Sequence, residues 1–472
     1  SAGGAGAAPE GGSQSTWLYG SLRRHACYFA DLRVGSRGQS VALVVDTGSQ
    51  LKGFPCEGCS HCGDHACPAF DPRASATFAP AACDSAPQCP AANGAHARCD
   101  GRRRCAFEEN YSEGSRITGY WFEDQVKLAP GPNSSEVHDP VTARLGCYDY
   151  EDPTFAGQQV SGILGLAPPA GNESTGVLQD MFRDWRSVNP GLFSMCLAED
   201  GGVLTFGGTN RQYHTAAEGG SVTWLRMKAD RYYNVSLVSL RVGAHSMPTT
   251  DADAEVAVSS GTTYTYFPER VFERIVKSIY EHCGLHNCDA WREGADPICW
   301  RLGRYTRKPD KFPTIHLEFE GLHGAPVSVR WPPDGYLYHR GGEGQVWCQA
   351  FLRNALPQTV LGASWMVHRD VIFDIAGKRL GVAPANCPRR AEELCTREDS
   401  LEEEEVDADG EQWGRMEAEP RASTELVVFA ALVVAAGAVL ACRASSLSAN
   451  QRQHVKRGQR GPPRPPGGRG QE

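Results

Sequence analysis

The sequence lacks an excess of positive charge. Its 47 lysines and arginines are outnumbered by 56 aspartates and glutamates, which gives a net charge of −9 and an isoelectric point near 5.9. Proteins that bind nucleic acid usually concentrate positive charge on one face, because contacts with phosphate supply much of their affinity. We therefore exclude nucleic acid as a partner of this chain.

Long uncharged runs are scarce as well. The one that stands out is the 17-residue run at 426–442, LVVFAALVVAAGAVLAC, which is at the short limit for a membrane span. An acidic, polar segment at 397–425 precedes it, and the tail after it has seven lysines and arginines and no acid before Glu472. Because positive charge favours the cytosolic side, we predict a type I membrane anchor. A buried core helix is the alternative.

The remaining chain is too long for one hydrophobic core. Residues 17–390 exceed the length at which single cores usually stop growing, about 250–300 residues, so we expect two lobes. We predict a disordered leader, an N-terminal lobe with a cysteine-rich insertion at 56–67, a C-terminal lobe, an acidic stem, a transmembrane helix and a basic cytosolic tail, at residues 1–16, 17–195, 196–390, 391–425, 426–442 and 443–472.

Both lobes have the pattern of short strands. Segments rich in β-branched and aromatic residues alternate with Gly, Pro, Asn and Asp, for example at 41–45, 203–206 and 371–374. One helix is expected after Pro268, because apolar residues recur there at i and i+4, with the proline in the first turn and Cys283 just beyond the end. The prediction is a mainly β protein.

Cysteine is abundant, with 18 residues, which is high for a protein of a reducing compartment. Asn-x-Ser sequons at Asn133, Asn172 and Asn234 also indicate the secretory lumen. Cys442 falls in the predicted span, so seventeen cysteines are left for the lumen. At least one of these is unpaired or bonded elsewhere.

The insertion at 56–67 combines cysteine with histidine. It contains Cys56, Cys59, His61, Cys62, His65 and Cys67. The Cys-x-x-Cys spacing is that of many zinc sites. The surrounding chain has many further cysteines and the expected compartment is oxidising, so we favour disulfides within the insertion and expect no metal and no cofactor.

Five short motifs occur in a fixed order. Asp46 begins Asp-Thr-Gly-Ser after an apolar run, Tyr111 begins Tyr-Ser-Glu-Gly-Ser, and Gly-Ile-Leu-Gly-Leu occupies 162–166. Ser-Ser-Gly-Thr-Thr follows at 259–263 and Val-Leu-Gly-Ala-Ser at 360–364. In this order they resemble the catalytic loops, the flap and the supporting strands of the pepsin-like aspartic proteases. The resemblance implies a mainly β, bilobal fold, here with a C-terminal transmembrane helix.

A narrower resemblance follows the first loop. Phe-Pro-Cys-Glu-Gly-Cys-Ser-His-Cys at 54–62 is similar to the cysteine-rich insertion of the plasmepsin V group, aspartic proteases of the apicomplexan secretory pathway. Segments at 193–197, 201–208 and 232–237 resemble the same group, as does the predicted anchor. This resemblance implies an endoplasmic-reticulum membrane protein with its lobes in the lumen.

Serine occupies position 259, where the resemblance implies the second catalytic aspartate. Two such aspartates share one proton; the ionised one deprotonates a water while the other protonates or polarises the scissile carbonyl. Asp46 can still act as a base, but the Ser259 hydroxyl is too weak an acid for proton exchange near neutral pH. Loss of general acid–base help lowers the rate about 100- to 10,000-fold, or about 3–5 kcal/mol.

A replacement carboxylate is not expected. The acids just upstream of the loop are Asp251, Asp253 and Glu255. In a strand Glu255 would sit about 13 Å back along the chain from Ser259, because each residue advances a strand by about 3.3 Å.

The resemblance also implies residues that bind substrate. Tyr111 is the expected flap tyrosine, with an exposed strand tyrosine as the alternative, and Glu113 matches a glutamate that contacts a substrate arginine. Gly48, Gly261 and Thr262 are expected to line the cleft. We therefore predict cleavage after leucine in Arg-x-Leu motifs. Serine follows the flap tyrosine where the group has cysteine, so no thiol-dependent feature is expected.

Three functions remain open at this point. The first is a membrane-anchored aspartic endopeptidase of the secretory pathway that processes exported proteins. The second is a catalytically inactive homologue that binds peptides or regulates an active paralogue. The third is a metal-binding or partner-docking module built on the insertion. We expect a monomer that contacts a membrane and a peptide or protein substrate.

Overall fold

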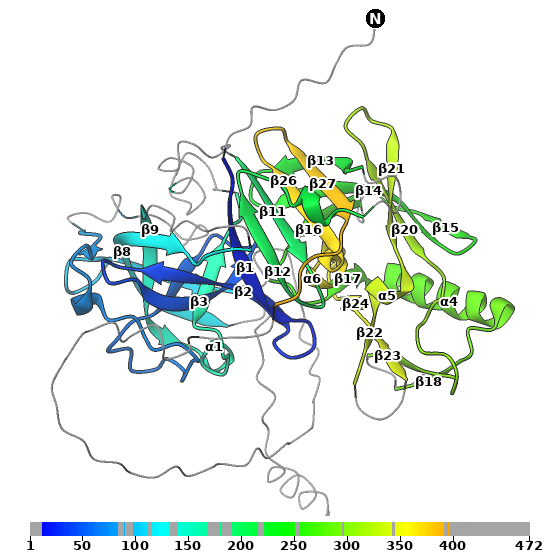
Figure 1. Cartoon of the computed structure of the whole chain (residues 1–472), viewed down its shortest axis with the longest axis horizontal. Coiled ribbons are helices and arrows are strands. Elements are labelled where there is room, and N and C mark those ends of the chain that lie inside the picture. The colour runs from blue at the N-terminus through cyan, green and yellow to red at the C-terminus, as the bar shows by residue number, and fades with distance from the viewer. Residues whose placement is uncertain are drawn as a thin grey trace, which may run out of the picture.

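The computed structural model describes residues 12–83, 89, 98–111, 115–132, 140–168, 180, 191–215, 221–250, 254–294, 297–341, 345–390 and 395. Strands dominate these ranges and helices are few, so the prediction of a mainly β chain is confirmed. Figure 1 shows the two lobes, one coloured blue to cyan and the other green to yellow, with β1, β12, β11 and β26 between them.

The N-terminal lobe is built almost entirely of strands. Its elements are β1 Gln14–Ser21, β2 Cys27–Val34, β3 Gln39–Asp46, β4 Lys52–Pro55, the 3-10 helix η1 Pro72–Ala74, β5 Ala79–Pro80, β6 Arg98–Cys99, β7 Cys105–Asn110, β8 Arg116–Leu128, β9 Val141–Glu151, α1 Pro153–Ala156 and β10 Gly162–Gly165. Because β1 begins at Gln14, residues 14–16 belong to a strand and not to the predicted leader.

The rest of the described chain adds the longest helix. Its elements are β11 Leu192–Leu197, β12 Asp200–Phe206, the 3-10 helix η3 Arg211–Tyr213, β13 Thr223–Ala229, β14 Tyr233–Val242, β15 His245–Pro248, β16 Glu255–Val258, β17 Thr265–Pro268, α4 Glu269–His286, β18 Ala290–Glu293, β19 Cys299–Leu302, β20 Ile315–Glu320, β21 Pro326–Trp331, α5 Pro333–Tyr336, β22 Leu337–His339, β23 Val346–Gln349, β24 Phe351–Asn354, β25 Thr359–Leu361, α6 Ala363–Met366, β26 Arg369–Asp374 and β27 Arg379–Pro384.

A sheet of antiparallel strands joins the two lobes. Its order is β1–β12–β11–β26–β27–β13, so the first described strand and the last described strand belong to one sheet. Trp17 pairs with Val203, and Met195 pairs with Val371. The lobes therefore share backbone hydrogen bonds and do not only touch through side chains.

The burial of the strands follows their sequence patterns. Residues 41–45 of β3 are each at most 1% exposed, and a strand covered on both faces reads as a continuous apolar run. β20 alternates instead, with Ile315, Leu317 and Phe319 buried and the polar residues between them partly exposed. The fully buried β3 is the strand that ends at Asp46 and positions it.

The predicted helix is present as α4, and its apolar stripe faces the core through Phe272, Ile275 and Ile279. Its predicted end was wrong. The helix continues past Cys283 and stops at Asn287, which adopts the left-handed conformation that asparagine tolerates better than most residues. Pro268 lies at the N-cap and not in the first turn.

Disulfides connect distant parts of the described chain, and no cysteine in these ranges is free. The pairs between two described cysteines are Cys56–Cys147, Cys59–Cys62, Cys67–Cys395, Cys83–Cys99, Cys89–Cys105, Cys196–Cys387, Cys283–Cys288 and Cys299–Cys348. Cys27 is also in a disulfide. The prediction of disulfides is confirmed. It was wrong to place them all within the insertion, because only Cys59–Cys62 closes there. Cys56 follows β4, which runs parallel to β9 and so brings it beside Cys147.

The predicted anchor at 426–442 and the tail at 443–472 lie outside the described residues. Within the described ranges, no helix is both long and apolar enough to cross a membrane. The sequons at Asn133 and Asn172 also lie outside these ranges. Asn234 lies inside β14 and its amide donates a hydrogen bond to Glu255 (2.9 Å), which counts against a glycan at this position.

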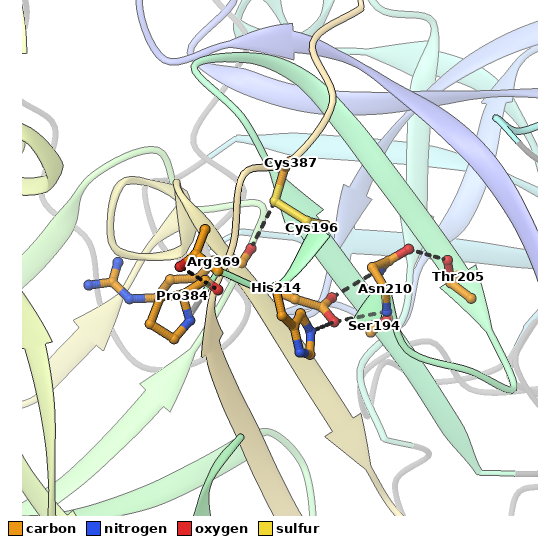
Figure 2. Close-up of polar contacts among 10 residues, drawn as sticks. Ser194, Cys196, Thr205, Asn210, His214, Arg369, Pro384 and Cys387 are labelled. Carbon is orange, nitrogen blue, oxygen red and sulfur yellow. Dashed lines mark hydrogen bonds and ion pairs between the residues drawn. A yellow bond between two sulfur atoms is a disulfide. The ribbon is translucent and has the colours of Figure 1, made fainter. Parts of the chain in front are cut away.

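A buried polar network holds β26 against the loop that follows β12. The Asn210 side chain, labelled in Figure 2, donates a hydrogen bond to Asp370 Oδ1 (3.0 Å), and His214 Nε2 lies 2.9 Å from Asp370 Oδ2. Asn210 donates in turn to Ser194 Oγ (2.9 Å) and accepts from Thr205 Oγ1 (2.9 Å). The Asp370 carboxylate is fully buried, and these bonds compensate for its removal from water.

We predict that replacing both Cys196 and Cys387 with alanine lowers the free energy of unfolding by about 2–5 kcal/mol. The disulfide spans 191 residues, whereas Cys283–Cys288 spans 5 and restricts the unfolded chain much less. The matched double replacement at Cys283 and Cys288 should therefore have the smaller effect. Urea unfolding of the three proteins measures both. Equal losses would contradict the prediction.

Candidate functional site

The two lobes present equivalent loops at the ends of buried strands. β3 ends at Asp46 and pairs in parallel with β10, with Asp46 opposite Gly165. β16 ends at Val258 and pairs in parallel with β25, with Val258 opposite Leu361. Ser259 is therefore the first residue after its strand. The two supported strand ends place 46–49 and 259–263 face to face.

Reciprocal hydrogen bonds lock these loops together. The Thr47 amide donates to Ser260 Oγ (3.0 Å) and the Thr47 hydroxyl donates to the carbonyl of Val258 (3.1 Å). The Ser260 amide donates to Thr47 Oγ1 (2.9 Å) and its hydroxyl to the carbonyl of Val45 (2.7 Å). Both side chains are fully buried, so water does not compete for these bonds. We define Thr47 and Ser260 as the loop clasp.

The Asp46 carboxyl is fully buried at the centre of the site. Oδ1 accepts hydrogen bonds from the amides of Gly48 (2.8 Å) and Gly261 (3.2 Å), and the Ser259 hydroxyl lies at 3.4 Å. Gly261 holds the place in the second loop that Gly48 holds in the first. Its amide donates across the lobes to Asp46.

Ser259 faces Asp46 directly and is buried. Its Oγ accepts a hydrogen bond from the Thr262 hydroxyl (2.9 Å), so Thr262 orients it. Glu255 does not approach this point: it is exposed and accepts the bond from Asn234. Asp251 and Asp253 lie outside the described residues. Among the described residues of the two loops, Asp46 is therefore the only carboxylate.

Glycine is required at both loop tips by close approach. A Cβ on Gly48 would collide with the Ser259 side chain, and a Cβ on Gly261 would collide with the Asp46 carboxyl. Each glycine thus makes room for the functional side chain of the opposite loop. This is the role that the structure gives to two residues that the sequence suggested only as cleft-lining.

Burial raises the pKa of the Asp46 carboxyl above its usual value. The nearby Ser49 hydroxyl and the Gly48 and Gly261 amides that donate to Asp46 lower this pKa, without outweighing burial. A carboxyl of this kind is a stronger base than an exposed aspartate once it is ionised. It can activate a water, but the described residues of the two loops offer no second carboxyl with which to share a proton.

The flap is the hairpin of β7 and β8, and Tyr111 follows β7. The Tyr111 amide donates to the carbonyl of Ser115 (2.9 Å), and its ring packs against Phe155 with 5.0 Å between centroids. Tyr111 is 4% exposed, so the alternative of an exposed strand tyrosine is wrong. Residues 112–114, and with them Glu113, lie outside the described residues.

Two glutamates end the flap strand β7 next to Asn110. Glu108 pairs with Arg116 (3.5 Å), whereas Glu109 is buried. Burial raises the pKa of Tyr232, and the charges of Asp46 and Glu109 raise it further. Tyr232 therefore lies within electrostatic range of both the flap and the central carboxyl. The sequence analysis did not identify Tyr232 or Ser260 as site residues. For Ser260 a signal was available, because it follows Ser259 as Thr47 follows Asp46.

The cysteine and histidine residues of the insertion do not form a zinc site. Each of its four cysteines is in a disulfide. His65 is held by Glu151 and by the carbonyl of Gln158, both at 2.9 Å. Sulfur atoms of Cys83, Cys89 and Cys105 also come together, but they belong to two adjacent disulfides and offer no thiolates to a metal.

We predict that Asp46→Asn stabilises the protein at neutral pH. Because the folded pKa of Asp46 is raised, ionisation of this buried carboxyl opposes folding; this penalty is absent below the unfolded pKa, about 3.9, and grows as pH rises through the folded pKa. We expect a melting temperature about 2–4 °C higher at pH 7 and no difference near pH 3. Calorimetry over this range tests it.

Asp71→Asn is the matched control. The hydrogen bonds of Asp71 with Arg73 lower its pKa, so its ionised form favours folding. The asparagine variant should show no gain at neutral pH. A gain of the same size in both variants would contradict the assignment of the Asp46 effect to burial.

The chain matches known proteins over both lobes. A family model described as xylanase inhibitor N-terminal matches residues 28–208, and one described as xylanase inhibitor C-terminal matches 232–384. Aspartic protease 5 of Toxoplasma gondii is 31% identical over 396 residues, which cover 79% of this chain and 37% of that protein. The chain thus spans well under half the length of this relative.

Two further relatives are covered more completely. Plasmepsin V of Plasmodium falciparum (isolate 3D7) is 23% identical over 456 residues, covering 79% of this chain and 73% of that protein. Aspartyl protease family protein 2 of Arabidopsis thaliana is 26% identical over 402 residues, covering 80% and 74%. With the bilobal fold and the paired loops, these matches show that the chain belongs to the pepsin-like aspartic proteases, in the plasmepsin V-like group.

Proposed function

We propose that the chain is a membrane-anchored endopeptidase homologue of the secretory pathway that binds peptides in its cleft and cleaves them slowly. The observation that carries this proposal is that Ser259 faces Asp46 across two loops that are otherwise equivalent. The loop clasp, the two loop glycines and the described part of the flap hairpin support a site that holds a peptide. What the two loops lack is the second carboxylic acid, which would assist the developing oxyanion.

The chemical step follows from the residues present. Ionised Asp46 takes a proton from a water that attacks the scissile carbonyl. Ser259 can donate a hydrogen bond to the developing oxyanion, but transfer of its proton is unfavourable near neutral pH. Protonation of the leaving amine then depends on Asp46 returning the proton it has taken. Asp46 must therefore act first as the base and then as the acid, two roles that are normally divided between two carboxyl groups.

The substrate proposed is a peptide with an Arg-x-Leu motif. Glu113 is the proposed partner of the arginine, since a carboxylate can receive a guanidinium through two parallel hydrogen bonds. Buried Glu109, on the strand that leads to the flap, supports a negative potential near the same end of the cleft. A cationic side chain is thus the chemistry that this side of the site favours.

The secretory lumen is the proposed location. Disulfides that join segments far apart in the sequence, such as Cys67 with Cys395, persist in oxidising compartments and not in the cytosol. The apolar run at 426–442 and the basic tail support a type I anchor in the endoplasmic-reticulum membrane.

Peptide binding without any cleavage is the second candidate function, and Ser259 favours it. A cleft that closes on a peptide but lacks the second carboxylate would sequester substrates or compete with an active paralogue. The two candidates differ only in residual turnover. They are separated by whether Asp46→Asn removes a measurable rate.

The decisive experiment compares cleavage of an Arg-x-Leu peptide by the full chain and by its Ser259→Asp and Asp46→Asn variants. We expect Ser259→Asp to raise kcat/KM about 100- to 10,000-fold, because it supplies the missing general acid. We expect Asp46→Asn to abolish whatever rate the unaltered chain has. An unaltered chain that cuts as fast as Ser259→Asp would overturn the proposal, whereas no rate above Asp46→Asn would favour binding alone.

A second prediction concerns the arginine. Glu113→Gln should weaken binding of an Arg-x-Leu peptide about 10-fold or more, since a charge-assisted hydrogen bond contributes about 1.5–3 kcal/mol. The same variant should bind an Ala-x-Leu peptide as the unaltered chain does. Fluorescence anisotropy measures both affinities. Glu108→Gln is the control, because Glu108 already pairs with Arg116, and an equal loss there would contradict the assignment to Glu113.

A further inference from the structure

A second buried pair of histidine and carboxylate lies outside the catalytic loops, in the N-terminal lobe. His65 Nε2 and Glu151 Oε2 are 2.9 Å apart, and their side chains are 4% and 1% exposed. His65 belongs to the disulfide-rich insertion, and Glu151 is the last residue of β9. Nothing in the chemistry of Asp46 and Ser259 requires this pair.

The pair is the centre of a wider contact between the insertion and the segment that follows β9. The Gly63 amide also donates to Glu151 Oε2 (3.1 Å), and His65 Nδ1 faces the carbonyl of Gln158 at 2.9 Å. A Cβ on Gly63 would collide with the backbone of Ala156 in α1, so the insertion lies directly on this helix. The insertion is therefore packed against α1 and hydrogen-bonded to the segment around it.

The same segment reaches the flap on its other side. Phe155 of α1 packs against the Tyr111 ring. Asp152 accepts a hydrogen bond from the Arg116 amide (3.1 Å) at the start of β8, and its own amide donates to the Arg116 carbonyl (3.1 Å). The side chain of Asp152 also caps α1 by accepting from the amides of its first turn. Both strands of the flap hairpin are thus anchored by the segment that holds Glu151.

We propose that His65 is a positioning residue: through Glu151 and α1, the disulfide-rich insertion sets the resting position of the flap over the cleft. The path runs from His65 to Glu151, then along α1 to Phe155, and from Phe155 to Tyr111. His65 touches neither substrate nor the reacting atoms. The proposal rests on the proposed function only in that the flap covers a bound peptide.

Protonation of His65 strengthens its pairing with Glu151 at acidic pH. Burial acts to lower the pKa of His65, but the hydrogen bond and charge of Glu151 outweigh it, with smaller contributions from the Gln158 carbonyl and Asp64, so the pKa is raised. His61 contacts Glu151 only through its backbone carbonyl, which accepts a hydrogen bond from the Glu151 amide. The stabilisation that protonated His65 gives through Glu151 is fully present below the pKa of histidine in the unfolded chain, about 6.5. It is lost as pH rises through the pKa of His65 in the folded chain.

Hydrogen exchange of the Tyr111 amide tests the proposal, because this amide is bonded to Ser115 within the flap and needs no ligand to be observed. In the full chain, His65→Ala should raise its exchange rate about 10-fold or more at pH 6. His65→Gln should restore much of the protection, since its amide can still donate to Glu151. In the unaltered chain, protection corrected for intrinsic exchange should weaken from pH 6 to pH 8, and in His65→Gln it should not.

His214→Ala is the matched control, because it removes the equivalent buried pair with Asp370 in the other half of the molecule (Figure 2). It should leave Tyr111 exchange unchanged. The proposal is overturned if His65→Ala leaves Tyr111 exchange unaltered, or if it speeds exchange equally in β26, which would mean a general loss of stability. Because exchange is read without peptide, failure here is distinguishable from failure of Ser259→Asp to restore cleavage.

Discussion

The loop clasp is the constraint on which the rest of the structure depends. Thr47 and Ser260 each donate and accept across the lobe boundary, and both are fully buried. These four hydrogen bonds, buried away from water, fix the separation of the two loops within lobes that one sheet already joins. The position of Asp46 relative to Ser259 follows from that separation.

The clasp also explains how the site tolerates a serine. The four hydrogen bonds of the clasp come from Thr47, Ser260 and backbone carbonyls, so none of them uses a carboxylate at position 259. The Gly261 amide adds a further contact between the loops by donating to Asp46. A serine at position 259 is therefore accommodated without disturbing the frame, and because activity depends on the site, the fold alone does not determine turnover.

Much of this arrangement was readable from the sequence because it is local. An apolar run predicts buried β3, and Asp46 must follow where that run ends; the apolar stripe of α4 likewise follows from its spacing. The partners of Cys56 and Cys67 were not readable, because they depend on which distant strands become neighbours. The end of α4 was missed because Asn287 stops the helix through backbone conformation and not through hydrophobic pattern. The contact of Phe155 with Tyr111 joins segments over 40 positions apart, and no periodicity signals it.

The disulfide between Cys67 and Cys395 has a consequence for the integrity of the chain. Cys387 is tied to Cys196, and Cys395 is tied to the insertion, so the backbone between these two cysteines is bracketed by covalent links. A single peptide-bond break at 388–394 would leave both fragments attached. Separating Cys395 from the lobes would then require reduction as well as proteolysis, so a protease acting alone at 388–394 would not release the segment that contains it.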